Sequence, residues 1–209
     1  MSRLFPEPRV ITLAPATGGI EALKASGLPK GRVSVVLSNH FVRYALVPWS
    51  AALSGAAEET AYVRHYFVRV YGDRAKAWSF RASPAPSGMP RLCSAVDTIL
   101  LEELKRIFSK SKAKLVSVQP ELMSTFNRWR GKVPATGAWL VMADAERACI
   151  GLHAKGNWQA VNNARGEWLP LLERERHRIG GALPDVVLLH SDQALRVDAA
   201  GWKVQQLAA

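Results

Sequence analysis

The sequence predicts an α/β protein made of two lobes in tandem, residues 1–130 and 138–209, joined by a linker at 131–137. Two observations carry this prediction. Short β-prone runs alternate with amphipathic stretches along the whole chain, and one order of elements occurs twice. In each part, three strands are followed by a helix and a further strand. Hydrophobic residues make up 48% of the 209 residues, enough to build a sizeable core.

The strands of the first part are predicted from β-branched residues and from alternation of apolar and polar side chains. Only the polar residues 38–40 separate two of these runs, which is typical of a β-hairpin. Residues 20–24 fit either a helical turn or an edge strand. The predicted strands are 9–14, 32–37, 41–47, 76–80 and 114–119.

Three helices are expected in the first part. Apolar residues recur at spacings of three and four over 50–72, and Gly72 is a suitable C-terminal stop. Ser94 and Asp97 have the spacing of a capping box, so a second helix should follow them. A short connecting helix is predicted over 121–129.

The second part begins with a predicted meander, because tight-turn compositions separate its first three β-prone runs. A helix over 167–179 follows, and the apolar run 185–189 is predicted to be a buried central strand. The last strand is reached through a loop where a second helix would be expected. The predicted strands are 138–142, 148–152, 158–161, 185–189 and 202–207.

This order of elements is that of the ribonuclease H-like fold, and two such units in tandem form the core of actin-like ATPases. The run VSVVLSNHFVRYALVPW at 33–49 resembles a hairpin in the cytoplasmic actin-like domains of the GspL and PilM type, from type II secretion and pilus systems. Residues 113–126 resemble the end of their first lobe, and 138–162 resemble the hairpin that opens their second lobe. The expected fold is therefore a reduced actin-like ATPase architecture.

The phosphate-binding loops of actin-like ATPases are absent from the sequence. Such a loop pairs an acid with glycine in the first hairpin of each lobe, but the first strand here has no Asp and the turn at 143–147 has no Gly. The resemblance therefore implies a non-catalytic cytoplasmic adaptor, without a cofactor. It would dock a motor protein or the cytoplasmic tail of an inner-membrane protein, either free in the cytoplasm or peripherally at the inner membrane.

Motifs for other chemistry are also missing. The sequence contains no Walker or dinucleotide-binding glycine motif, no Gly-x-Ser-x-Gly and no His-Glu-x-x-His. A ribonuclease H-like nuclease needs several carboxylates at adjacent strand ends to hold two metal ions. Asp144, Asp185 and Asp192 are the available acids in the second part, and they fit turns and caps better.

The formal charge of +11 suits an acidic protein partner, an anionic membrane surface or nucleic acid. The residues predicted to bind a partner are Arg43, expected to be exposed, and the patch Arg128, Trp129 and Arg130. Core or inter-lobe packing of Trp129 stays open. Two other functions also stay open, a nucleic-acid-binding protein and a divergent actin-like ATPase, as do the identity of the partner and the oligomeric state.

Overall fold

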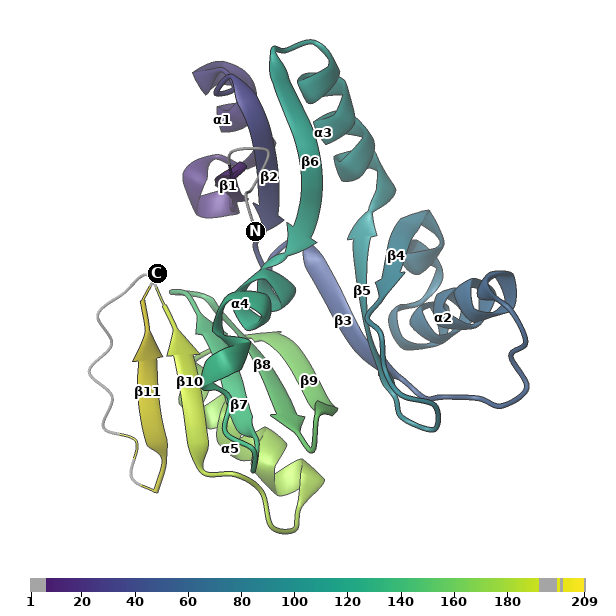
Figure 1. The fold of residues 1–209 in the computed structure, drawn as a ribbon, viewed down its shortest axis with the longest axis vertical. Coiled ribbons are helices and arrows are strands. Elements are labelled where there is room, and N and C mark those ends of the chain that lie inside the picture. The colour runs from purple at the N-terminus through teal and green to yellow at the C-terminus, as the bar shows by residue number, and fades with distance from the viewer. Residues whose placement is uncertain (1–6, 192–198, 200, 209) are drawn as a thin grey trace, which may run out of the picture.

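The computed structural model describes residues 7–191, 199 and 201–208, and these form three β-sheets with five α-helices (Figure 1). We call them sheet A, with strand order β1-β2-β6; sheet B, with order β3-β5-β4; and sheet C, with order β11-β10-β7-β8-β9. Sheets A and B come from the first part of the chain and sheet C from the second. No helix of the described residues is both long and apolar enough to cross a membrane.

Sheet A is entirely parallel. Its central strand has five consecutive buried residues, because strands flank it on both edges and helices cover the sheet. The connection from β1 to β2 runs through a short 3₁₀ turn and a helix. The elements around this sheet are β1 (Arg9–Leu13), η1 (Pro15–Thr17), α1 (Gly19–Ser26), β2 (Gly31–Leu37), α3 (Thr98–Ser109), β6 (Ala113–Pro120) and α4 (Glu121–Trp129).

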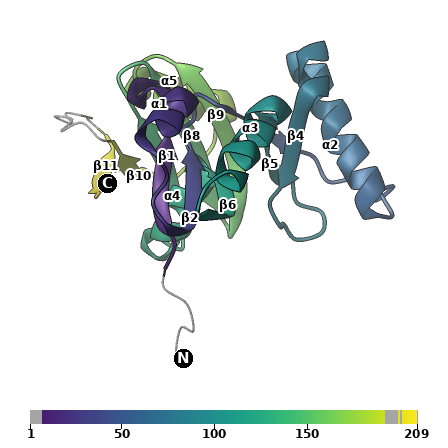
Figure 2. The same ribbon diagram turned by 90° about the horizontal axis from the view of Figure 1, so that it is seen from above.

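Sheet B is antiparallel and carries its own small core. Phe67 is fully buried there and contacts the rings of Tyr71 and Phe80 at centroid distances of 5.7 and 5.2 Å. Helix α2 lies on the outer side of this sheet, farthest from sheet C (Figure 2). The elements are β3 (Val42–Val47), α2 (Ala56–Tyr71), η2 (Asp73–Ala77), β4 (Trp78–Ala82) and β5 (Arg91–Asp97).

The predicted hairpin between 32–37 and 41–47 is wrong, although both segments are strands. Strand β2 pairs in parallel with β1 and β6, whereas β3 pairs with β5 in sheet B. The connecting residue Asn39 explains the redirection. Its backbone N–H donates to Glu121 and its carbonyl accepts from Asn163, so the turn is fixed to other elements and the chain leaves sheet A.

One helix start and one helix cap also differ from the prediction. Helix α2 begins at Ala56, because Gly55 is extended and the Glu58 carboxylate accepts hydrogen bonds from Ser54 ahead of it. Ser94 lies inside strand β5 and takes no part in a capping box. Asp97 alone caps α3, its side chain accepting from the N–H of Ile99 at 2.9 Å.

Sheet C agrees with the prediction. Strands β7 to β9 form the expected antiparallel meander, and β10 is a buried strand between β7 and β11, parallel to both. This strand order is the ribonuclease H-like one. The elements are β7 (Ala138–Ala143), β8 (Arg147–Ala154), β9 (Asn157–Arg165), α5 (Trp168–Ile179), β10 (Val186–His190) and β11 (Lys203–Leu207). Most of the predicted loop before β11 lies outside the described residues.

The first part does not form the ribonuclease H-like lobe predicted for 1–130. Its first three strands are divided between sheets A and B, so an antiparallel meander is missing. Sheet A instead repeats the parallel half of sheet C, with β1, β2 and β6 in the places of β7, β10 and β11. A 3₁₀ turn, η3 (Arg130–Lys132), leads from α4 toward sheet C, and the domain boundary at 131–137 stays a prediction.

Candidate functional site

A cleft of about 970 Å³ lies between sheets A and C. The carboxyl ends of parallel strands from sheets A and C point toward each other (Figure 1). The residues that directly follow β1, β2, β7 and β10 line the walls of the cleft: Ala14, Ser38, Asp144 and Ser191. Binding sites in open α/β sheets usually form outside the carboxyl ends of strands. Helix α4 forms one further wall.

Helix α4 presents one face to the cleft, because residues three and four apart share a face. Glu121, Thr125 and Arg128 line it from successive turns, together with Ser124 and Trp129. The Trp129 ring is half-buried and packs on the core, with the Arg128 guanidinium 5.4 Å and the Lys132 ammonium 5.3 Å from its centroid. Trp129 therefore both packs and borders the cleft.

The turn after β2 joins three elements at the cleft. Asn39, 3% exposed, accepts a hydrogen bond from the Tyr44 hydroxyl at 2.9 Å. Its backbone N–H donates to Glu121 Oε2 at 3.0 Å, and its carbonyl accepts from Asn163 Nδ2 at 2.7 Å. Burial raises the pKa of Tyr44 well above its usual value, so this hydroxyl stays a neutral donor. The turn is a rigid part of the wall.

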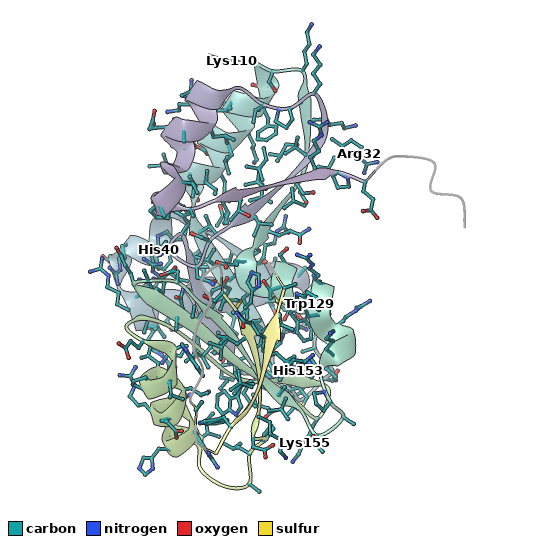
Figure 3. The ribbon with its side chains drawn as sticks, turned by 90° about the vertical axis from the view of Figure 1, so that its left-hand side faces the viewer. Arg32, His40, Lys110, Trp129, His153 and Lys155 are labelled. Carbon is teal, nitrogen blue, oxygen red and sulfur yellow. The ribbon has the colours of Figure 1, made fainter. Side chains whose placement is uncertain are left out.

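The turn between β7 and β8 reaches the first part of the chain. His40 Nε2 lies 3.0 Å from Asp144 Oδ2. His40 lies where the first and second parts of the chain meet (Figure 3). The other carboxylate oxygen, Asp144 Oδ1, accepts from the N–H groups of Glu146 and Arg147 at 2.8 and 2.9 Å. These two amides are therefore engaged within the turn. Arg147 Nη1 also donates to Asn163 Oδ1 at 3.0 Å.

The turn after β1 uses its amides in the same way. The N–H groups of Thr17 and Gly19 donate to the carbonyl of Ala14, and that of Gly18 donates to Pro15. A phosphate-binding loop must offer free N–H groups to its ligand. At both turns that border the cleft, these backbone donors are already bound to the protein itself.

The four predicted partner-binding residues separate in the structure. Arg128 and Trp129 line the cleft, and the exposed Arg130 at the end of α4 does not. Arg43 was expected to be exposed, but it is half-buried and its Nη1 donates to the carbonyls of His40 and Val42, both at 3.1 Å. Burial, and then the charge of Arg147, lower its pKa.

Sequence reasoning missed Arg147 and Arg165, which add positive charge to the cleft. Both lie in the β7-to-β9 meander that the sequence does predict, Arg147 directly after its first turn. However, the meander gives no local signal that these ends of its strands face the first part of the chain.

The acids considered for a nuclease do not converge. Asp144 lies at the cleft. Asp185 precedes β10 at the opposite end of that strand, about 16 Å from the end at the cleft if each residue advances about 3.3 Å. Asp185 pairs with Lys203 at 2.9 Å, and a hydrogen bond from this lysine lowers its pKa. Asp192 lies outside the described residues. No group of three metal-ligating side chains occurs within the part of the chain that the structure describes.

We found no protein-family model and no curated protein sequence that matches the chain. Solved structures do match. The cytoplasmic domain of EpsL, an inner membrane component of the type II secretion system of Vibrio cholerae, aligns with a TM-score of 0.59 and 12% identity. The alignment covers 91% of this chain and 76% of that domain.

A PilM–PilN type IV pilus biogenesis complex aligns with a TM-score of 0.65 and 14% identity, over 92% of this chain and 73% of that one. A protein from Bacteroides thetaiotaomicron with an actin-like ATPase fold and unknown function aligns at 0.52 and 10% identity, over 79% and 61%. The chain has an actin-like fold. The inter-sheet cleft is thus a feature of an actin-like framework, reached here with a first sheet reduced to three parallel strands.

Proposed function

We propose that this chain is a non-catalytic cytoplasmic adaptor of a pilus or secretion assembly, docking an inner-membrane or motor protein. The observation that carries this proposal is the similarity in fold to EpsL and PilM over more than nine-tenths of the chain. One of these is an inner-membrane secretion component, and the other is solved in a complex with PilN. The partner would be a protein with an acidic cytoplasmic segment, because the chain carries a charge of +11.

The hydrogen bonding within the turns that border the cleft supports a protein that binds partners without catalysing a reaction. Nucleotide binding between the lobes would need N–H groups for the phosphates, and those at 17–19 and 146–147 are used internally. A divergent ATPase would have to break the Asp144 turn first. Nucleic-acid binding rests on the positive charge alone, since the basic residues are spread along the chain.

The test is recovery of partners from native membranes at moderate salt, using the tagged full chain with and without nuclease. The adaptor role predicts that one inner-membrane pilus or secretion component is recovered in both samples and binds again as a purified protein. Loss of all partners on nuclease treatment contradicts this role and favours nucleic acid. Stabilisation of the chain by Mg²⁺ and ATP in a thermal melt would favour the ATPase.

A further inference from the structure

Strand β1 has an open edge, whereas the equivalent edge of sheet C is paired with strand β8. In sheet C, β7 is flanked by β10 on one side and by antiparallel β8 on the other. In sheet A, β1 occupies the place of β7 and pairs with β2, and no other described strand pairs with it. The counterpart of β8 is therefore missing from this sheet.

The exposed edge of β1 lacks the features that protect other edges. Folded proteins usually blunt an edge strand with charge or proline. Strand β6 carries Lys114 and ends at Pro120, and β11 carries Lys203. Strand β1 instead reads RVITL, and the apolar side chain of Val10 is 65% exposed. After its first residue it has no charge that would discourage pairing.

This edge borders the cleft. Val10 and Thr12 line it, whereas Ile11 and Leu13 pack into the core of the opposite face, as the alternation of a strand requires. A strand added to β1 would therefore direct every second side chain toward the cleft. Arg128, Arg147 and Arg165 line the cleft there. Three carboxylates also line it, those of Glu121, Asp144 and Glu146. Those of Glu121 and Asp144 already accept hydrogen bonds from backbone N–H groups.

The cleft wall also contains hydrogen-bond donors that lack an acceptor. The Ser38 hydroxyl, the Trp129 indole N–H and the Arg147 Nε–H are buried and have no hydrogen-bond partner among the described residues. Indole and guanidinium groups are donors only, so an entering group must supply oxygen acceptors to satisfy them. Carboxylate side chains of an entering segment would supply such oxygens, once the donor side chains have moved slightly to meet them.

We propose that the edge of β1 receives an extended acidic segment of the partner protein as an antiparallel strand. Acidic side chains of the segment alternate with apolar ones and face the arginines of the cleft. The antiparallel direction follows from β8, which has this direction on the equivalent edge of sheet C. The inference rests on the proposed adaptor function and specifies where and how the partner binds.

The probe is a labelled peptide, Glu-Val-Glu-Val-Glu-Val, about as long as β1, titrated with the full chain and followed by fluorescence anisotropy at moderate salt. Val10→Asp places a like charge on the exposed edge and should weaken binding at least about tenfold. The matched control is Gln205→Asp, the same change in charge on the exposed edge of β11, which should bind as the wild type does. Arg128→Gln should weaken binding severalfold, and Arg130→Gln should not.

Absence of peptide binding overturns the proposal, as does equal weakening by Val10→Asp and Gln205→Asp. Equal binding of Lys-Val-Lys-Val-Lys-Val overturns the acidic preference. The membrane recovery experiment repeated with Val10→Asp separates the two proposals. If the membrane partner is still recovered, the docking site is wrong and the adaptor role stands. If the peptide binds at β1 and no membrane partner is recovered, the adaptor role fails alone.

Discussion

Sheets A and C contain the same parallel trio in the same order, but only sheet C completes it. In sheet C, β8 and β9 extend the trio on the β7 side, and the core on one face contains two fully or nearly buried tryptophans, Trp139 and Trp202. In sheet A, no such hairpin extends the trio beyond β1 among the described residues, and the segment between β2 and β6 builds sheet B instead. From this comparison we infer that sheet C provides most of the stability and that sheet A provides the strand edge to which a partner binds.

The largest expected effect tests sheet C as the frame. Trp139 is fully buried in β7, donates from Nε1 to the carbonyl of Pro184 at 3.0 Å and contacts the Trp202 ring. Trp139→Ala should lower the free energy of unfolding by about 3–5 kcal/mol, measured by urea denaturation. Trp49→Ala, at a side chain 43% exposed, is the control and should change it little. Similar losses from both variants would contradict the comparison.

A second test concerns how tightly β8 and β9 close on each other. A Cβ on Gly151 would lie 2.5 Å from a ring carbon of Trp158. Gly151→Ala should therefore destabilise the fold by about 1–3 kcal/mol through overpacking. Gly131→Ala adds the same methyl group where nothing lies within 4 Å, and its denaturation midpoint should stay near that of the wild type.

The link between the two halves gives a somewhat smaller effect. Asn163 Nδ2 donates to the carbonyls of Asn39 and Val42, and its Oδ1 accepts from Arg147. Asn163→Ala removes these three hydrogen bonds and should cost about 1–2 kcal/mol of unfolding free energy. Asn127→Ala, an exposed change on α4, is the control. An unchanged midpoint for Asn163→Ala would mean that the halves are held together otherwise.

The smallest effect concerns the thiol in sheet B. Burial raises the pKa of Cys93 to about 12. The unfolded thiol ionises near 9 and the folded one does not, so unfolding becomes easier as the pH rises above about 9. The contribution of this thiol should reach on the order of 1 kcal/mol near pH 10. Cys93→Ala should reduce the alkaline loss of stability in urea melts; an unchanged pH profile would count against this assignment.

The elements that local chemistry defines could be predicted from the sequence. Turn residues and alternation located the meander of sheet C, and Gly72 marked the end of α2. Pairing in the first part could not be predicted, because parallel partners such as β2 and β6 are distant in sequence. The segments 32–37 and 41–47 have the local pattern of a hairpin, but their partners are β6 and β5, and Asn39 between them bonds to Glu121 and Asn163.

The candidate site could also be predicted only where local sequence patterns mark its residues. Aromatic and basic residues in succession marked Arg128 and Trp129, and both line the cleft. Arg147 and the open edge of β1 depend on which strands become neighbours, so no local pattern reveals them. Arg43 looked exposed by alternation along β3, but the turn carbonyls of His40 and Val42 hold its guanidinium.

Amide hydrogen exchange of the full chain, with and without the Glu-Val-Glu-Val-Glu-Val peptide, tests the central claim most directly. An added strand on sheet A should slow exchange in Arg9–Leu13 while leaving the edge strand β11 (Lys203–Leu207) unchanged. Exchange that stays unchanged in β1 while the peptide protects β6 or β11 would contradict the claim that β1 is the docking edge.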